Sequence, residues 1–191
     1  MFDLKGRAAF IAGGAGYLAA PACRALLTHG ADIIVGDLNA ERLRNTVADL
    51  TEEYPKSVVE AHHFDISDEE SIKGAVSRMQ DRFGRFDILV NATAYSAGKI
   101  VEEVTGEEFN KSIQINVTGS FLLARAAAQV MEHGGSIIMF SSMYGLISPN
   151  SKDYPEGIDK NPVDYGVSKA GLVQMVKYLA GHYGKKNIRV N

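Results

Sequence analysis

The sequence alternates, from start to finish, between short apolar runs and longer amphipathic stretches. Runs rich in Ile and Val, such as 32–37 and 88–91, have the length and composition of buried strands. The stretches between them have the spacing of helices that bury one face. This order predicts a doubly wound, Rossmann-like α/β fold, with one parallel sheet and helices on both of its faces.

The pattern predicts six strands and five longer helices in one domain that spans residues 1–191. Ser67 with Glu70, and Thr105 with Glu108, have the spacing of capping boxes and predict two helix starts. Asn39 is a third candidate N-cap. The predicted strands are 7–12, 32–37, 58–65, 88–91, 136–140 and 188–190, and the predicted helices are about 17–29, 39–54, 67–83 and 105–131, with a last one around residues 165–169.

Composition excludes several classes of protein. The chain has 191 residues, a net charge of -3 and a pI near 6.0, which gives no indication of a nucleic-acid partner or an anionic membrane surface. Its single cysteine, Cys23, cannot form an internal disulfide, and such usage fits a reducing cytoplasm. No apolar run reaches the roughly 18 residues of a membrane span. We therefore expect a soluble cytoplasmic protein without a metal site.

Glycines connect the first predicted strand to the first predicted helix. Gly13, Gly14 and Gly16 are followed by Tyr17 and Leu18, where the helix is expected to begin. Glycines at such a turn let the backbone approach a pyrophosphate, whose charge the helix N-terminus stabilises. The segment is therefore a candidate dinucleotide-binding loop.

Asp37 ends the second predicted strand, 21 residues after Gly16. A carboxylate at this place accepts hydrogen bonds from the ribose hydroxyls of NAD and repels the 2′-phosphate of NADP. Leu38 adds no compensating charge, and we expect Arg42 and Arg44 to face solvent. The sequence therefore predicts NAD, with NADP less favoured.

Tyr165 and Lys169 are four residues apart in a predicted helix, so their side chains share one face. A tyrosine with a pKa of about 10 is a poor acid-base catalyst at neutral pH, and a nearby ammonium lowers that pKa. A serine pair, Ser141 and Ser142, ends the fifth strand region upstream. Together these residues predict proton-transfer chemistry.

The ordered motifs resemble the short-chain dehydrogenase/reductase family over nearly the whole chain. Besides the glycine loop, the resemblance rests on Asp65-Ile66, on the segment 83–91, on Asn116-Val-Thr-Gly119, on Ser141-Ser142, on Tyr165-x-x-x-Lys169 and on the closing Ile188-Arg-Val-Asn191.

The resemblance implies a role for each matching residue. Tyr165 would exchange a proton with the substrate oxygen, and Lys169 would lower the tyrosine pKa and hold the nicotinamide ribose. Ser142 would orient the substrate oxygen, and Asn116 would interrupt its helix and anchor a water that links Lys169 to solvent. Cofactor contacts are implied at Asp65, Ile66, Asn91, Ala92, Tyr165 and Lys169, in addition to the glycine loop and Asp37.

The chain departs from the compact branch of the family in three places. Tyr17 and Ala19 stand at two usual glycine positions, and only the first residue of the usual Asn-Asn-Ala-Gly is kept, at Asn91. Ser142 precedes Tyr165 by 23 positions, so we expect extra residues in the loop over the substrate side. The resemblance also implies a C-terminal portion beyond strand six, and we expect this chain to lack it.

The leading functional hypothesis is an NAD-dependent oxidoreductase that interconverts a secondary alcohol and a ketone. A nucleotide-sugar epimerase or dehydratase is an alternative, favoured by the glycine loop and opposed by Val173, where that branch usually has Glu. A non-catalytic dinucleotide-binding regulator is a second alternative, which the intact set of site residues opposes.

The substrate prediction rests on the long loop before Tyr165. Its polar residues Asn150, Lys152, Asp153 and Glu156 favour a small hydroxylated molecule such as a sugar or polyol. The resemblance further implies a homodimer or homotetramer.

Overall fold

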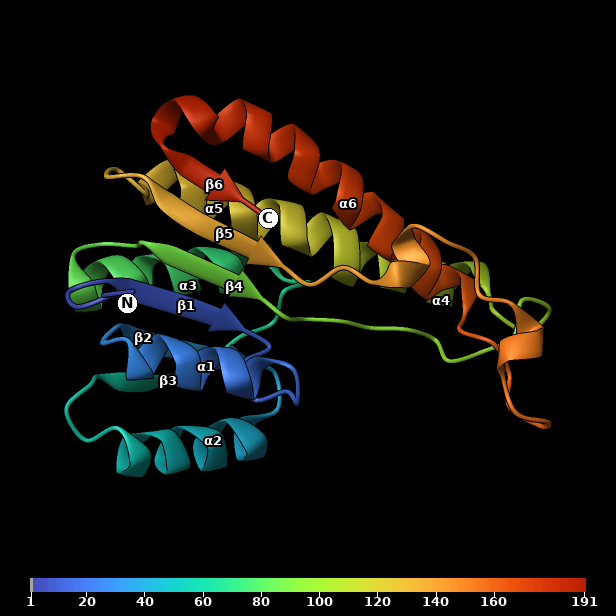
Figure 1. Ribbon diagram of the computed structural model, residues 1–191, viewed down its shortest axis with the longest axis horizontal. Coiled ribbons are helices and arrows are strands. Elements are labelled where there is room, and N and C mark those ends of the chain that lie inside the picture. Colours follow the sequence, from blue (N-terminus) through green and yellow to red (C-terminus); the bar gives the residue numbers. More distant parts are fainter. Residues whose placement is uncertain (1) are drawn as a thin grey trace.

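The strands of the computed structural model, which describes residues 2–191, form one parallel sheet in the order β3-β2-β1-β4-β5-β6 (Figure 1). This is the strand order of the doubly wound fold, so the predicted fold class is confirmed. Their bounds are β1 (Ala8–Ala12), β2 (Asp32–Asp37), β3 (Val59–His63), β4 (Ile88–Asn91), β5 (Gly135–Met139) and β6 (Ile188–Val190).

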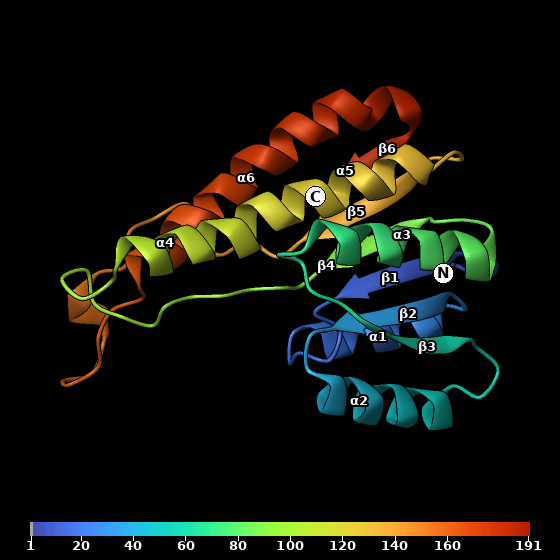
Figure 2. The same ribbon diagram turned by 180° about the vertical axis from the view of Figure 1, so that it is seen from behind.

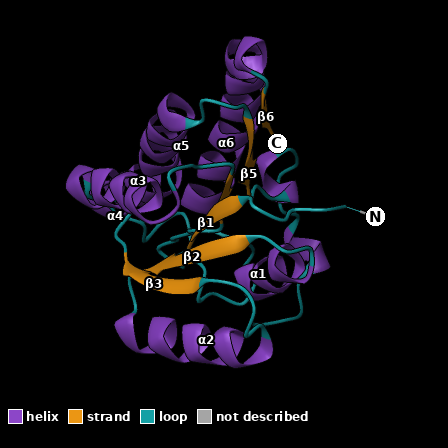
Figure 3. Ribbon diagram, turned by 90° about the vertical axis from the view of Figure 1, so that its left-hand side faces the viewer, coloured by secondary structure: helices purple, strands orange, loops and turns teal. Residues whose placement is uncertain are grey.

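Helices cover the two faces of this sheet in separate layers, as the views from behind and from the side show (Figures 2 and 3). One layer holds α3 (Glu69–Phe83), α5 (Ser120–Val130) and α6 (Val163–Tyr183), and the other holds α1 (Ala19–Thr28) and α2 (Ala40–Glu53). Alternate residues of each strand pack against the two layers: Phe10 of β1 faces the first and Ile11 faces the second. The sheet is therefore buried on both faces where both layers extend.

Ile138 of β5 shows where the second layer ends. Its side chain is 38% exposed on the face that α1 and α2 cover elsewhere, and it lies outside the core that these helices form with the sheet. Neighbouring Ile137 faces the first layer and is fully buried.

A π-helical segment, η1 (Gln114–Gly119), interrupts the predicted long helix and divides it into α4 (Gly106–Ile113) and α5. Three short 3-10 segments complete the list: η2 (Met143–Gly145), η3 (Ser151–Asp153) and η4 (Gly184–Lys186).

Two of the three predicted helix starts are confirmed. The Thr105 side chain accepts from the Glu108 N–H in a complete capping box, and Asn39 caps α2. The prediction for Ser67 is wrong, because Asp68 is the N-cap of α3. The Ser67 hydroxyl instead donates to Asp65 Oδ1 at 2.6 Å.

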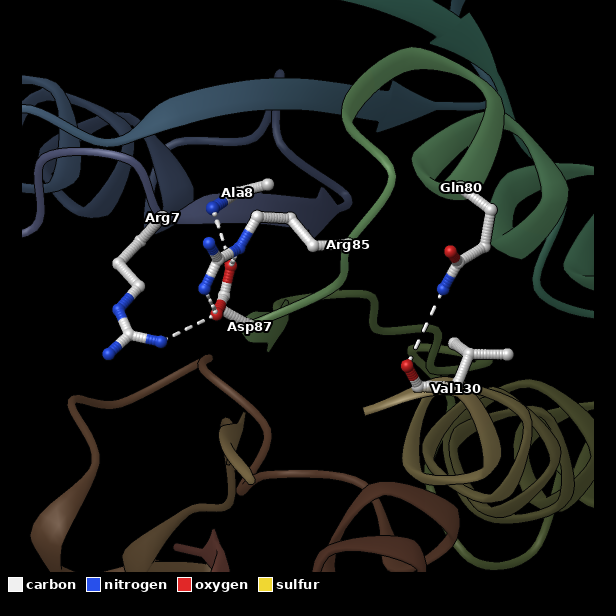
Figure 4. A network of polar contacts seen from close by, with 6 residues as sticks. All are labelled: Arg7, Ala8, Gln80, Arg85, Asp87 and Val130. Carbon is white, nitrogen blue, oxygen red and sulfur yellow. Dashed lines mark hydrogen bonds and ion pairs between the residues drawn. The ribbon is translucent and has the colours of Figure 1, made fainter. Parts of the chain in front are cut away.

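The amino-terminal edge of the sheet is held by a paired carboxylate, Asp87, directly before β4 (Figure 4). Asp87 accepts from Arg7 at 2.8 Å, from Arg85 at 2.6 Å through two nitrogens, and from the Ala8 N–H at 2.9 Å. Burial raises the pKa of Asp87, but these donors together outweigh it and hold the pKa below its usual value. Asp87 thereby ties β1 to β4.

Within residues 2–191, no helix combines the length and the apolar character needed to cross a bilayer.

Candidate functional site

The predicted site residues converge at the carboxyl edge of the sheet, opposite Asp87. Parallel strands all end at this edge, and open α/β sheets bind ligands there. β1 and β4 are neighbours, with Ala12 beside Asn91, so the glycine loop after β1 and the segment after β4 run side by side.

The glycine loop is closely packed. Gly13 has a φ of +70°, and a Cβ on it would lie 3.0 Å from the backbone of Ala92 and Thr93. A Cβ on Gly14 would lie 2.5 Å from Val35 Cγ1. Side chains at either position would push the loop off the sheet. These two glycines therefore keep the backbone of the loop accessible next to the end of β4.

The rest of the loop leads into α1 without filling the cradle. The Gly16 N–H donates to the Gly13 carbonyl at 3.0 Å, which closes the turn. Tyr17 and Leu18 are 93% and 60% exposed. The helix begins at Ala19, two residues later than predicted.

Asp37 lies next to this loop and is only 6% exposed. Its Oδ2 accepts from the Ala15 N–H at 3.2 Å and its Oδ1 from the Asn39 N–H at 2.9 Å. Arg42 faces solvent as predicted, and its guanidinium also lies 3.8 Å from Asp37 Oδ1. Asp37 therefore shapes the glycine loop, and its contact with a ribose stays a prediction.

Asp65 and Ile66 follow β3; the Asp65 side chain is half-buried and partly engaged, and that of Ile66 is buried. Asp65 Oδ1 accepts from the N–H and the hydroxyl of Ser67. Ile66 is 5% exposed and belongs to the core. A Cβ on Gly119 would clash with the Ile66 carbonyl, so glycine at that position lets η1 approach this segment. A cofactor contact at Ile66 would have to use the backbone.

Asn91 and Ala92, at the end of β4, also form hydrogen bonds to neighbouring groups of the protein. Asn91 is 4% exposed, donates to Ser120 Oγ at 2.8 Å, and accepts from the N–H and hydroxyl of Thr93. The Ala92 N–H donates to the Ala12 carbonyl. This arrangement fixes the turn that faces Gly13.

Tyr165 and Lys169 lie on one face of α6, as predicted. Lys169 Nζ is 5.4 Å from the centre of the Tyr165 ring and donates to the Phe140 carbonyl at 2.6 Å. Lys169 is only 2% exposed, and among residues 2–191 no carboxylate forms an ion pair with it. Burial without a counter-ion lowers the pKa of the Lys169 ammonium to about 8.

Three contacts hold the serine pair against α6. Besides the Lys169 bond to Phe140, Ser141 Oγ donates to the Lys169 carbonyl at 2.9 Å. A Cβ on Gly145 would lie 2.7 Å from the Lys169 backbone, so η2 lies directly on the helix. Ser142 Oγ accepts from the Tyr144 N–H at 3.2 Å. Ser142 is thereby brought to the helix that carries Tyr165.

Asn116 is fully buried inside η1, and its side chain is occupied by protein contacts. Its Oδ1 accepts from the Tyr95 N–H at 2.8 Å, and its Nδ2 lies within hydrogen-bond distance of the Tyr95 carbonyl, Ser112 Oγ and Ser168 Oγ. The expected interruption of the helix is present, whereas the water link to Lys169 stays a prediction.

Asp164, next to Tyr165, was not predicted from the sequence, and the structure buries it completely. Its carboxylate accepts from the Ala97 N–H at 2.9 Å and from Ser96 Oγ at 3.3 Å. An acidic residue in the first turn of a helix is ordinary, because it complements the helix dipole. Only the tertiary fold shows that this one is buried.

A hollow of about 720 Å³ lies beside the start of α6. Its walls include Leu146, Ile147 and Ile158, and none of Asn116, Ser142, Tyr165 and Lys169 lines it. The four polar residues on which the substrate prediction rests are exposed, and they do not line it either. A contact between these four residues and a substrate stays a prediction.

Comparison with known proteins decides the family. Residues 14–191 match the family described as enoyl-(acyl carrier protein) reductase. The trans-4-hydroxycyclohexanecarboxylate dehydrogenase of Sinomonas cyclohexanicum is 33% identical over 97% of this chain and 70% of its own length. The ribulose-forming D-arabinitol 2-dehydrogenase of Scheffersomyces stipitis is 32% identical over 100% of this chain and 70% of its own length.

The chain belongs to the short-chain dehydrogenase/reductase family. It is an oxidoreductase of this family, as the dehydrogenase names of these relatives indicate. Among solved structures, an NAD⁺-bound xylitol dehydrogenase superposes with a TM-score of 0.88 at 27% identity, over 98% of this chain and 69% of that one. A short-chain dehydrogenase from Burkholderia cenocepacia, solved with NADP, gives a TM-score of 0.86 at 27% identity over 98% and 73%.

Proposed function

We propose that the protein is an NAD-dependent dehydrogenase that interconverts a secondary alcohol and a ketone by a Ser-Tyr-Lys mechanism. The observation that carries the proposal is the attachment of the Ser141–Ser142 segment to α6 beside Tyr165 and Lys169. The dehydrogenase names of the relatives do not favour the epimerase or dehydratase alternative.

In this proposal the chain performs the proton half of the reaction. Tyr165 takes the hydroxyl proton of the alcohol, or returns it to the ketone, while Ser142 hydrogen-bonds the same oxygen. Lys169 is mostly protonated at pH 7, since its pKa is about 8, and its charge stabilises the tyrosinate. The nicotinamide, when bound, supplies or takes up the hydride.

The residues present fit a dinucleotide. Gly13 and Gly14 leave a backbone cradle that a Cβ would close, and Asp37 lies beside it at the end of β2. Asp37 supports NAD over NADP, because a buried carboxylate repels a 2′-phosphate. We expect a preference of at least about tenfold in kcat/KM. Solved neighbours with each cofactor make direct measurement necessary.

The relatives supply the basis for the substrate class. One acts on a pentitol, another on a hydroxylated cyclohexane ring, and a further one, at 30% identity, is a D-threitol dehydrogenase of Mycolicibacterium smegmatis. We therefore infer a polyol, a sugar or a related hydroxylated substrate for this chain.

The proposal is tested by a screen of polyols, sugars and hydroxycyclohexanecarboxylates with NAD and NADP, following reduced cofactor by absorbance. Tyr165→Phe should lower kcat by about 10²–10⁴-fold and leave the Kd for NAD within about threefold, because only the ionisable oxygen is lost. Tyr178→Phe, at a residue of α6 that is 68% exposed, is the matched control. Wild-type turnover in Tyr165→Phe would refute the mechanism.

We also infer that the protein forms a homodimer or homotetramer. Phe121 of α5 and Val167 and Tyr178 of α6 are large apolar side chains with 37%, 46% and 68% exposure. Exposed side chains of this kind support burial against another subunit. Light scattering after gel filtration measures the mass directly, and a monomeric mass would contradict the inference.

A further inference from the structure

The segment that follows β4 is held in place by two buried side chains from other elements. Asn116 of η1 bonds both the N–H and the carbonyl of Tyr95, at 2.8 Å and 2.7 Å. Asp164 of α6 bonds the Ala97 N–H at 2.9 Å and the Ser96 hydroxyl at 3.3 Å. Three consecutive residues are thus fixed from two directions.

This segment connects the cofactor side of the candidate site with the start of α6. It continues directly from the Asn91–Thr93 turn, which packs on Gly13 of the glycine loop. Figure 1 shows that the chain leaves the sheet at the end of β4 and runs outward toward α4, and the bonds of Asp164 hold it there to the first turn of α6. Tyr165 is the next residue after Asp164 in that turn.

Burying the carboxylate of Asp164 to make these bonds costs free energy of folding. It is fully buried, and among residues 2–191 no cation forms an ion pair with it. A buried charge without a counter-ion opposes folding unless hydrogen bonds and dipoles compensate. Here the compensation comes from Ala97, from Ser96 and from the amino-terminal dipole of α6.

We propose that the Tyr95–Ala97 segment forms one wall of the substrate site, and that Asp164 is a positioning residue that fixes this wall to the turn of α6 bearing Tyr165 and so sets the distance between them. The inference rests on the proposed dehydrogenase function. Asp164 acts through Ser96 and Ala97 and does not touch the reacting atoms. Without the hydrogen bonds of Asp164 to Ser96 and Ala97, the segment and Tyr165 move independently, and a misplacement of about 1 Å costs up to roughly 10²-fold in rate.

The test compares Asp164→Ala with Asp164→Asn. The alanine variant loses both acceptor oxygens, whereas the asparagine Oδ1 still accepts from the Ala97 N–H. We expect Asp164→Ala to lower kcat/KM for the alcohol by about 10–100-fold, with the Kd for NAD changed by less than about threefold. Asp164→Asn should restore kcat/KM to within about fivefold of wild type.

Asp87→Asn is the matched control, because it alters a buried carboxylate at the opposite edge of the sheet. It should lower the melting temperature but leave kcat/KM of the folded protein unchanged. If Asp164→Ala behaves like Asp87→Asn, losing stability but not kcat/KM, Asp164 is merely structural and the proposal is overturned. Equal impairment of Asp164→Asn and Asp164→Ala also overturns it, since the charge rather than the acceptor geometry would then matter.

Hydrogen exchange gives a readout that needs no activity and no fully stable alanine variant. Peptides covering 94–98 should exchange faster in Asp164→Ala than in wild type, and Asp164→Asn should retain most of the protection. Unchanged protection of this segment from exchange in Asp164→Ala would show that Asp164 does not hold it in place. If the wild-type protein oxidised no alcohol, the proposed function would fail, while this exchange experiment would still decide whether Asp164 holds the segment in place.

Discussion

The two most deeply buried carboxylates at the edges of the sheet differ in their partners. Asp87, at the amino edge, accepts from two arginines and a backbone N–H (Figure 4). Asp164, at the carboxyl edge, has one N–H and one hydroxyl and no paired cation in the described part of the chain. Lys169, a buried cation at the same edge, likewise has only a carbonyl partner.

The difference separates two uses of buried charge. Charge that is fully paired stabilises the junction at which it lies and has little left for other chemistry. Charge that is left short of partners costs stability and is typical of sites that bind ligands or move protons. Asp87, at the amino edge of the sheet, is a charge of the first kind. Asp164 and Lys169, on the carboxyl side that the proposed reaction uses, are charges of the second kind.

Lys169→Met should have the largest effect of the variants that test this difference. We expect kcat to fall by about 10²–10⁴-fold, because the cation that stabilises the tyrosinate is lost. Stability should move in the opposite direction. The folded pKa of Lys169 is about 8, below its ordinary 10.5, so the native state binds fewer protons than the unfolded state between these values.

Wild-type stability therefore rises with pH through the window from about 8 to 10.5, as the buried ammonium loses its proton. Below pH 8 the variant should be more stable than wild type by up to about 3 kcal/mol, and the gain should vanish near pH 10.5. Urea titrations at pH 7 and pH 10 measure this. A variant that is less stable than wild type at pH 7 would show that Lys169 is adequately paired.

Asp87→Asn examines the paired edge. We expect a loss of about 2 kcal/mol in the free energy of unfolding at pH 7, because two guanidinium groups lose their counter-ion although both are partly exposed. The pKa of Asp87 is held below its usual value, so its contribution is present above pH 4 and lost as pH falls through the folded pKa. The penalty should therefore shrink in acid, and a penalty that is constant down to pH 3 would contradict the pairing argument.

The fold and the placement of Tyr165 and Lys169 followed from the sequence because both depend on local periodicity. Strand-helix alternation sets the layers, and a spacing of four sets a shared helix face. Asp164 could not be found in this way, because its burial depends on Ser96 and Ala97, almost 70 residues earlier in the chain. The reach of Arg42 to Asp37, five positions earlier, was missed for a different reason, because it depends on how α2 leaves β2.

Close backbone packing was visible in the sequence only as isolated glycines. Gly145 carries no turn requirement of its own, and its small size is explained only by the Lys169 backbone against which it lies. The segment Asn116–Gly119 was recognised as a motif, whereas the contact of Gly119 with Ile66 required the packed structure. Sequence patterns therefore located the site but not the contacts that hold it together.

Gly145→Ala, at the carboxyl edge, should have an intermediate effect. Its Cβ would lie 2.7 Å from the Lys169 backbone, so η2 must shift and carry Ser142 with it. We expect kcat/KM to fall by about tenfold or more. Gly181→Ala, in the same helix layer with open space around its Cβ, is the control and should be neutral or stabilise by up to about 1 kcal/mol. Unchanged kinetics in Gly145→Ala would show that η2 does not set the position of Ser142.

Arg42→Ala should have the smallest effect. It concerns Asp37, a carboxylate whose cation is exposed and more distant, in contrast to the fully paired Asp87. The Arg42 guanidinium lies 3.8 Å from Asp37 and is 63% exposed, so it partly offsets the charge that should reject NADP. Exposed pairs of this kind contribute about 0.2–1 kcal/mol. Removing Arg42 should therefore raise the ratio of kcat/KM for NAD over NADP by about two- to fivefold.

Arg44→Ala, an exposed neighbour in α2, should leave the ratio unchanged. Asp37→Asn should lower the ratio by more than either arginine changes it, while the acceptor for the Ala15 N–H is kept. A ratio that falls in Arg42→Ala would mean that Arg42 favours NAD directly, and its role as an offset to Asp37 would be wrong.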